Sequence, residues 1–386
     1  MKVIKQNVGI DVSKETLAVC LVMLHEDLSV KVKGSKSFAN NQDGFKQLLA
    51  WVLSKRAPEV RLSFTMEPTG VYYENLAYFL HAQKEIVHIV LPVRAKRYAE
   101  SLPGDSKTDK LDAKALGRMG VERSLDVWQI ETPIYKDLKQ LTRERESLIK
   151  ERTNVKNRLH ALLNSANPFQ KSIKRLKGLI KYFDKQIQAI EEDIKDLVIS
   201  EEWLRKKVEQ VISIPGVGLL TAVIVIAETN GFALIKSIKQ LVSYAGLDVK
   251  IRESGAWKGK AKISKKGNVH IRKAMYFPAY TNMKHSKNYL GLYSRIFAKK
   301  QKSLIAATAT QKKLLGLIYT LWKNETVYIE DYQQQKSLTE RNKKISGNGE
   351  TRPSFSFLPE QKLVGAKPPL NKIDFSPKLR KKPSFC

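Results

Sequence analysis

The sequence predicts an α/β N-terminal domain, a helical coiled-coil hairpin, a mainly α-helical C-terminal domain with a helix-hairpin-helix, and a disordered tail. Three observations predict this organisation. Short apolar runs alternate with helical patterns near the N-terminus, a heptad seam follows, and helical periodicity resumes at Leu204. We expect the four parts to span residues 1–130, 131–200, 201–325 and 326–386.

The first domain is expected to hold a mixed sheet, because adjacent strands come first and strands then alternate with helices. The first two apolar runs are separated by a short polar turn at Ser13, Lys14 and Glu15. Strands are predicted at 8–12, 17–23, 30–38, 61–66 and 86–93, and helices at 41–53, 72–82 and 107–123.

The middle of the chain has the periodicity of a coiled coil. From Ile173 to Leu197 apolar residues recur at alternating spacings of three and four, which places them on one seam of a helix. A break at 164–170 is expected to turn an earlier helix back onto this one. Arg145 and Arg152 interrupt the seam of the earlier helix, which favours an assembly with further partners. The pattern leaves open whether the hairpin closes on itself or pairs with another subunit.

The composition indicates a polyanionic partner. The 386 residues carry 69 Lys and Arg against 38 Asp and Glu, a net charge of +31, and 42% are hydrophobic, which is enough for a core. The apolar run Leu219–Ala227 is far shorter than the ~20 residues of a membrane span. No signal peptide is expected at the N-terminus, because Asp11 interrupts the first apolar stretch. Nucleic acid is therefore favoured over a membrane surface.

The two cysteines, Cys20 and Cys386, exclude a disulfide framework and a cysteine-based zinc site. This usage fits a reducing cytoplasm.

The positive charge is concentrated in one segment. Residues 251–323 contain 17 Lys and Arg and a single acid, Glu253. Such a segment favours phosphate binding over a merely solvated face. The basic tail is expected to be disordered and to serve, at most, as an accessory arm for nucleic acid. The candidate phosphate-binding side chains are Arg252, Lys258, Lys260, Lys262, Lys265, Lys266 and Arg272.

Four acids are candidate metal ligands. Asp11 interrupts an apolar strand, Glu67 follows another, and Asp109 and Asp112 are three residues apart on a predicted helix, so their carboxylates share a face. Taken singly, Asp11 could cap a turn, and the pair could mark a solvated helix start. Together they are the hard oxygen ligands that a phosphodiester site with Mg²⁺ or Mn²⁺ needs.

Two further motifs are candidates for contact with DNA. Gly216 and Gly218 lie between predicted helices, where backbone N–H groups could approach a phosphate, although a plain tight turn has the same composition. Ser254 precedes a glycine among cations that would stabilise an attacking alkoxide. On these grounds alone, Ser264 is an equal candidate for the nucleophile.

In their order along the chain these motifs resemble those of the IS110-type transposases, including the IS1111 branch and the Piv-like DNA invertases. The resemblance covers residues from about 7 to 300. It rests on Gly-Ile-Asp11, Met-Glu67-Pro-Thr-Gly, Lys-Thr-Asp109-Lys-Leu-Asp112-Ala, Ile-Pro-Gly-Val-Gly218, Tyr-Ala-Gly-Leu247, Ser254-Gly and Ile-Ser-Lys-Lys-Gly-Asn268.

This resemblance implies a RuvC-like (RNase H-fold) first domain whose four acids, the DEDD set, bind Mg²⁺. It also implies that Ser254 attacks DNA to form a covalent phosphoserine link, in an active site composed of acids and serine from different subunits. Partners would be donor and target DNA and a structured guide (bridge) RNA encoded beside the gene. A homodimer or homotetramer, formed through the coiled coil, would work in the cytoplasm of a bacterium or archaeon, in association with the nucleoid.

Three alternatives remain at this point. A nuclease of the Holliday-junction-resolvase type would use metal-activated water and form no covalent intermediate. A Piv-like enzyme would invert a DNA segment site-specifically. A non-catalytic nucleic-acid-binding protein would have lost its acids, whereas all four are present in this chain.

Overall fold

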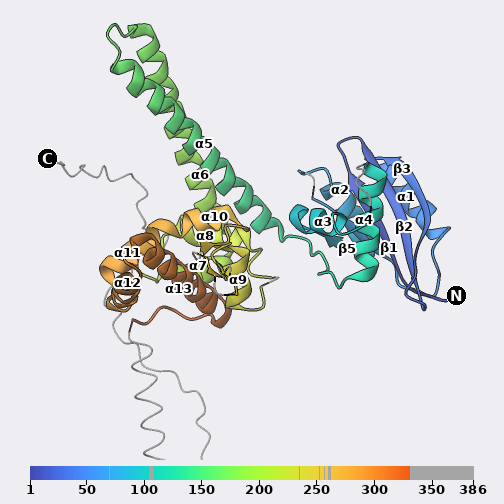
Figure 1. The fold of residues 1–386 in the computed structure, drawn as a ribbon. Coiled ribbons are helices and arrows are strands. Elements are labelled where there is room, and N and C mark those ends of the chain that lie inside the picture. The colour runs from blue at the N-terminus through green and yellow to red at the C-terminus, as the bar shows by residue number, and fades with distance from the viewer. Residues whose placement is uncertain are drawn as a thin grey trace, which may run out of the picture. The chain divides into compact units, whose positions relative to one another are not determined.

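A computed structural model describes residues 1–68, 70–103, 108–233, 235–251, 253–255, 257–259 and 262–330. The chain forms two compact units, Met1–Ile130 and Glu131–Cys386 (Figure 1). The predicted tail therefore lies outside the described residues, except for its first few. No helix in the described part of the chain is long and apolar enough to cross a membrane.

The first unit contains the predicted mixed sheet. Its strand order is β3-β2-β1-β4-β5, with β1 antiparallel to β2, β2 antiparallel to β3, and β1, β4 and β5 mutually parallel. This order and these directions agree with the RNase H-like fold that the resemblance implies. The strands are β1 (Val3–Val12), β2 (Thr16–His25), β3 (Val30–Ala39), β4 (Ser63–Met66) and β5 (Ile86–Ile89).

Helices cover both faces of this sheet. Buried residues of α1 (Gln42–Leu53) and α2 (Glu74–Ala82) share a core with Val8 and Ile10 of β1. On the opposite face, α4 (Asp109–Glu122) packs Ala113 against Cys20 of β2. Because successive side chains of a strand point to opposite faces of the sheet, the sheet forms one core with α1 and α2 and another with α4, as expected for a sheet with helices on both sides.

One predicted element is wrong in its extent. The strand predicted at 86–93 ends at Ile89, and Pro92 begins a helix, α3 (Pro92–Ala99), that the sequence pattern did not predict. Proline fits the first helical position because its missing N–H would have no intrahelical partner there. The apolar residues on both sides of Pro92 gave the segment the appearance of one long strand.

The second unit is mainly helical, as predicted, with four two-residue strands. Its long helices are α5 (Pro133–Leu163) and α6 (Gln170–Ser200), which pack together as a hairpin. The remaining elements are α7 (Glu202–Ile212), α8 (Leu219–Glu228), α9 (Ile238–Tyr244), β6 (Val249–Lys250), β7 (Glu253–Ser254), β8 (Trp257–Lys258), β9 (Lys262–Ile263), α10 (Val269–Ala274), α11 (Tyr276–His285), α12 (Lys287–Lys300) and α13 (Ser303–Asn324).

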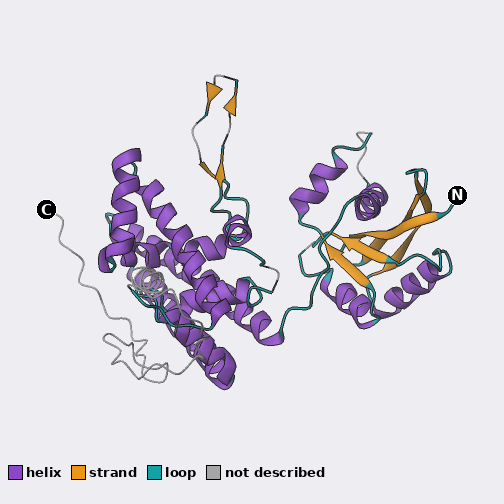
Figure 2. Ribbon diagram, turned by 90° about the horizontal axis from the view of Figure 1, so that it is seen from below, coloured by secondary structure: helices purple, strands orange, loops and turns teal. Residues whose placement is uncertain are grey.

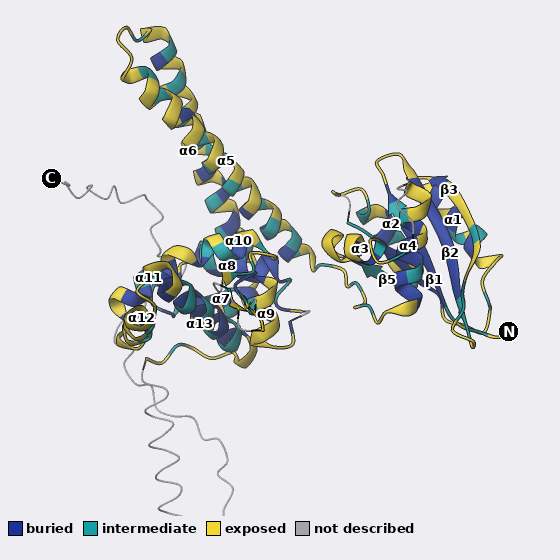
Figure 3. Ribbon diagram, in the orientation of Figure 1, coloured by how far each residue is buried: buried dark blue, intermediate teal, exposed yellow. Residues whose placement is uncertain are grey.

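The base of the hairpin shares the core of this unit, whereas its far part is largely exposed (Figure 3). Leu138 of α5 and Ile194 of α6 are fully buried together with residues of α7, α8 and α13. Arg145 and Arg152 are paired inside the hairpin, with Glu191 and Asp184 of α6 respectively. Each of the two arginines that interrupt the seam thus has an ion-pair partner within the hairpin, so their presence does not require an additional subunit.

Candidate active site

The sheet face under α4 is built from alternate residues of β1. Val8 and Ile10 enter the core on one side, so Asn7, Gly9 and Asp11 face α4 on the other. A Cβ atom on Gly9 would lie 2.0 Å from the carbonyl oxygen of Ala113, which shows how closely the helix backbone approaches the strand.

The direction of α4 along β1 follows from these contacts. Gly120 lies against Asn7, while Ala113 lies against Gly9 two residues further along the strand. The helix therefore runs antiparallel to β1, and its first turn, with Asp109 and Asp112, reaches the end of the strand where Asp11 lies.

Glu67 reaches the same edge through strand pairing. Ile10 of β1 is in register with Met66, the last residue of the parallel strand β4. Asp11 follows Ile10, and Glu67 follows Met66. Both carboxylates therefore lie at the carboxyl ends of neighbouring parallel strands. In α/β sheets this edge is where ligands usually bind.

The four acids influence one another electrostatically. Burial, together with the negative charges of Asp109, Asp112 and Glu67, raises the pKa of Asp11 to about 6. A hydrogen bond from the backbone of Val12 opposes the shift but does not cancel it. Like charges repel at this edge, and a cation between them would relieve the repulsion.

The donors fit Mg²⁺ or Mn²⁺ in kind, since all four are carboxylates. Among the described residues, however, no three His, Cys, Asp or Glu side chains are grouped closely enough to hold a metal ion by themselves. Mg²⁺ usually keeps several waters and binds through only one or two carboxylates together with substrate phosphates. The arrangement therefore fits an ion shared between the protein, water and DNA.

Close contact of Gly9 with α4 yields a prediction. Gly9→Ala is expected to lower the free energy of unfolding by about 1–3 kcal/mol or more, because its Cβ meets a backbone oxygen that cannot give way. It is also expected to reduce metal-dependent DNA cleavage, since α4 carries Asp109 and Asp112. Urea denaturation and a cleavage assay measure the two effects.

The matched control is Gly178→Ala on α6, where a Cβ meets nothing within 4 Å. It should raise helix stability by up to about 1 kcal/mol and leave cleavage unchanged. Equal stability of Gly9→Ala and wild type would contradict the close packing of α4 on β1.

Ser254 lies in the other unit, on an extended segment that we call the serine arm (residues 246–267). In the arm, β6 pairs with β9, and β7 pairs with β8 so that Ser254 opposes Trp257. Gly255 has φ +55°, which suits the tight turn that follows Ser254. The side chain of Ser254 is exposed. Figure 2 shows the short strands of the arm (orange) projecting from the helices of the unit.

Ser264 has a different environment near the base of the arm. Its hydroxyl donates a hydrogen bond to Oδ1 of Asp248, and accepts one from the backbone N–H of Lys266 at 3.3 Å. Its own N–H donates to the carbonyl of Asp248 at 2.8 Å. Ser264 therefore has a structural role in closing the arm, which distinguishes it from the exposed Ser254.

The predicted phosphate-binding cations are distributed unevenly. Lys262, Lys265 and Lys266 are exposed near the base of the arm. Arg272 has a structural contact, since its Nη1 donates to the carbonyls of Ala245, Gly267 and Asn268 at 2.8, 3.1 and 3.2 Å. Arg252, Lys260 and the side chain of Lys258 lie outside the described residues.

The two glycines between α7 and α8 differ in their surroundings. Gly216 has φ +80°, and a Cβ there would lie 2.9 Å from Cβ of Thr281 on α11. Gly218 is exposed immediately before α8, and a Cβ there would meet nothing within 4 Å. The turn is therefore packed against α11 on one side and open at Gly218.

A buried acid, Glu228, was not anticipated as a functional or structural residue. Arg143 of α5 donates two hydrogen bonds to its carboxylate, at 2.7 and 2.9 Å, and Asn268 Nδ2 donates a third at 2.6 Å. Burial raises the pKa of Glu228, but these hydrogen bonds and the charge of Arg143 outweigh it, so the pKa is lowered. One feature of the sequence could have indicated this buried acid, because Glu228 directly follows the apolar run Leu219–Ala227.

This network fixes the base of the serine arm. Asn268 also donates its N–H to the carbonyl of Tyr244 at 2.7 Å, and its side chain accepts from the N–H of Ile271 at 3.0 Å. The Tyr244 hydroxyl donates to the carbonyl of Glu228 at 2.8 Å. The two ends of the arm are thus joined to each other and, through Arg143, to the hairpin.

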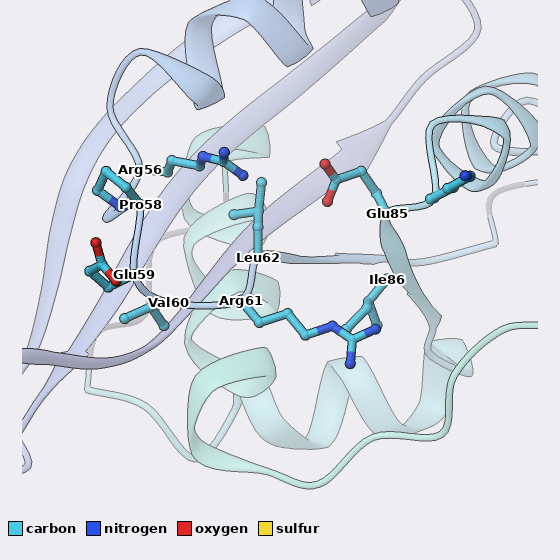
Figure 4. Close-up of a pocket in the computed structure, with 9 residues that line it drawn as sticks. Arg56, Pro58, Glu59, Val60, Arg61, Leu62, Glu85 and Ile86 are labelled. Carbon is cyan, nitrogen blue, oxygen red and sulfur yellow. The ribbon is translucent and has the colours of Figure 1, made fainter.

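The first unit also contains a pocket of about 190 Å³ (Figure 4). It is lined at the amino ends of β4 and β5 by residues that include Arg56, Arg61 and Glu85. Since Asp11 and Glu67 lie at the opposite, carboxyl ends of the parallel strands, this pocket is separate from the candidate active site.

Comparisons with known proteins give matches in both units. A family model for DEDD transposases of the IS110 type, described as "Transposase", matches residues 8–168. A second, described as "Transposase IS116/IS110/IS902 family", matches residues 208–294.

Two relatives agree with these matches. The pilin gene-inverting protein of Moraxella bovis is 30% identical over 280 residues, which cover 71% of this chain and 82% of that protein. The transposase for insertion sequence element IS1111A of Coxiella burnetii is 25% identical over 270 residues, 62% of this chain and 72% of that protein.

Among solved structures, Thermus thermophilus RuvC, in complex with a Holliday junction substrate, aligns with 32% of this chain and 99% of its own at 11% identity, with a TM-score of only 0.25.

The α/β unit with four acids at one sheet edge, the basic helical unit and the two family matches define the class of this protein as a transposase. More specifically, the chain belongs to the IS110 family of transposases.

Proposed function

We propose that this chain is the transposase of an insertion sequence, and that it cuts and rejoins DNA with Mg²⁺ (or Mn²⁺) and Ser254 as the nucleophile. The observation that carries the proposal is the convergence of Asp11, Glu67, Asp109 and Asp112, from three separate segments, at one edge of the sheet. An acid-rich edge would be costly in a protein that only binds DNA. An enzyme that uses a divalent cation requires it.

Asp11 and Glu67 would hold the metal from the strand ends, and Asp109 and Asp112 from the first turn of α4. A bound divalent cation would neutralise charge on the phosphate oxygens as the phosphodiester reacts. The protein's own contribution is to hold the carboxylates at a fixed edge. Asn40 supports this edge, because its Nδ2 donates to the carbonyls of Ser13 and Tyr72 at 2.8 and 3.2 Å and so joins the loops that follow β1 and precede α2.

Ser254 would attack the scissile phosphorus. A bond forms between its Oγ and phosphorus, the bond from phosphorus to one strand end breaks, and that end leaves as a hydroxyl after the serine has given up its proton. In the second step a hydroxyl of the new partner strand attacks the same phosphorus, and Ser254 leaves and regains a proton. The phosphodiester bond energy is conserved, so strands are rejoined without another energy source.

The exposure of Ser254 and the positive charge of its arm support this role. The described cations Lys262, Lys265 and Lys266 lie on the same arm, near its base. A positive field lowers the cost of the alkoxide and of the charge that develops on the phosphate. Ser254 is also the more accessible of the two serines, because Ser264 is only partly exposed and its hydroxyl is held between Asp248 and the backbone N–H of Lys266.

The partners would be donor and target DNA, a guide RNA, and further copies of the chain. The cationic segment 251–323 would hold the phosphates of the nucleic acids. Gly216 and Gly218 would contribute backbone N–H groups at the start of α8. The hairpin of α5 and α6 would join subunits, so that the acids of one copy act with the serine arm of another.

A second candidate function is site-specific DNA inversion. The similarity to the pilin gene-inverting protein of Moraxella bovis over 71% of this chain favours it. Inversion uses the same cutting and rejoining steps as transposition. The two functions differ only in which DNA ends are joined, so both would use the residues named above.

The proposal is tested against a hydrolytic nuclease by looking for a covalent product. The full-length protein is incubated with end-labelled DNA and Mg²⁺, denatured, and separated by electrophoresis. We expect labelled DNA to migrate with the denatured protein and to be lost when the metal is chelated. Cut DNA with no protein-linked label would instead identify a resolvase-type nuclease, in which water attacks.

A further inference from the structure

The surface of α11 carries an aromatic cluster, which we define as Tyr276, Phe277 and Tyr280. The rings of Tyr276 and Phe277 are 5.3 Å apart and nearly perpendicular, and those of Tyr276 and Tyr280 are 5.0 Å apart. Phe277 is 75% exposed and Tyr276 is 40% exposed. A large aromatic side chain with this exposure contributes little to the core, so its presence indicates a binding surface.

The charge around the cluster points to a polyanion. From Ser254 to Asn324 the sequence contains no Asp or Glu, so α10, α11, α12 and α13 carry no acid. Lys284 lies one turn beyond Tyr280 on α11 and is exposed. Aromatic side chains among cations are the usual surface for unpaired nucleotides, because bases stack on the rings while phosphates contact the cations.

The turn that contains Gly216 and Gly218 packs against α11, the helix that carries the aromatic cluster. Gly216 packs against Thr281, the residue that follows Tyr280. Phe277 and Thr281 are four residues apart, which is about 6 Å along the helix axis. One nucleotide could therefore place its phosphate near the turn and its base on a ring of the cluster.

We propose that the aromatic cluster binds unpaired nucleotides of a DNA strand by stacking their bases. This inference rests on the proposed function and extends it, because exchange of strands requires that cut ends leave the duplex. The cluster would hold such an end, and the surrounding cations would neutralise its phosphates. A fully paired duplex hides the faces of its bases, so it would not gain from the rings.

The test compares unpaired and paired DNA in binding to the full-length protein carrying Ser254→Ala, which removes the proposed nucleophile. Fluorescence anisotropy is measured with oligodeoxythymidine and with a fully paired duplex of the same length. Phe277→Ala is expected to weaken binding of oligodeoxythymidine on the order of 5- to 100-fold and to leave duplex binding unchanged. Phe277→Trp should retain the affinity, since a larger ring still stacks.

The matched control is Tyr182→Ala, which removes an exposed aromatic ring on α6, outside the acid-free segment. It should leave oligodeoxythymidine binding unchanged. If Phe277→Ala lost affinity for oligodeoxythymidine and for the duplex in equal proportion, the stacking site would be overturned. Wild-type affinity of Phe277→Ala for oligodeoxythymidine would overturn it as well. If the protein bound oligouridine tightly and did not bind oligodeoxythymidine, the assignment of the cluster to DNA would be overturned. Because these measurements do not depend on the nucleophile, their outcome is separate from that of the covalent-product assay.

Discussion

Asp11→Asn is expected to reduce DNA cleavage by roughly 10²- to 10³-fold, because the substitution removes a negative metal ligand while keeping the shape of the side chain. Asp11 lies at the acidic edge, where its pKa is raised by burial and by the charges of Asp109, Asp112 and Glu67. The amide cannot supply that charge. The rate of strand cleavage in Mg²⁺, measured under single-turnover conditions, reports the loss.

The same substitution should make the first unit more stable in the absence of metal. The raised pKa of Asp11 means that its ionised form is disfavoured in the folded state. Ionised Asp11 therefore lowers the stability in full above pH about 6. This cost shrinks as the pH falls below 6 and is gone below the ordinary value of 3.8, where the carboxyl group is protonated in the unfolded chain as well. Asp11→Asn removes the cost at neutral pH. Thermal denaturation with and without Mg²⁺ should show stabilisation by the metal in wild type and much less in the variant.

Asp126→Asn is the control, since Asp126 is an exposed acid of the same unit at a distance in sequence from all four acids. It should cleave DNA at the wild-type rate. If Asp11→Asn cleaved DNA as fast as this control, Asp11 would not be a metal ligand. If both variants lost activity equally, the loss would reflect the change in net charge of the protein and not the removal of a metal ligand.

Ser254→Ala is expected to abolish the covalent protein–DNA product and to lower strand joining by on the order of 10⁴-fold or more, as removal of a nucleophile does in other enzymes. Ser254 is exposed at the turn of the serine arm, so the methyl side chain causes no clash and the fold should be unchanged. The covalent product is measured by labelled DNA that remains with the denatured protein, and binding of DNA is measured separately.

Ser264→Ala provides the comparison between the two serines. It removes the hydrogen bond to Asp248, and the expected cost is about 1 kcal/mol of stability with the covalent product retained. A reversal, in which Ser264→Ala loses the covalent product and Ser254→Ala keeps it, would move the nucleophile to the base of the arm.

Much of the first unit could be predicted because its sequence patterns are local. The apolar runs near Val8, Leu17 and Phe64 all became strands. The four acids were assigned to one site because Asp11 interrupts a strand, Glu67 follows one, and the other two share a helix face. The contact that positions Asp109 and Asp112 could not be predicted in this way. It depends on the absence of a side chain at Gly9, and the sequence shows the glycine but not the helix that approaches it.

The second unit shows why the rest was missed. The strands of the serine arm are two residues long, which is too short to give a periodic signal. Arg145 and Arg152 looked unpaired on the seam because their partners Glu191 and Asp184 belong to another helix. The role of Glu228 was missed for the same reason, since Arg143 is 85 residues away in the sequence. Long-range pairs of this kind become visible only when the helices are packed.

The central claim is that DNA becomes linked to Ser254 with the help of the acids in the first unit. The most direct measurement is mass spectrometry of the protein–DNA product after digestion with protease and nuclease, performed on wild type and on Asp11→Asn. We predict a nucleotide linked through phosphate to Ser254 in wild type and a strong decrease of that peptide in Asp11→Asn. A nucleotide on any other residue, or equal amounts of the Ser254 product in both proteins, would contradict the claim.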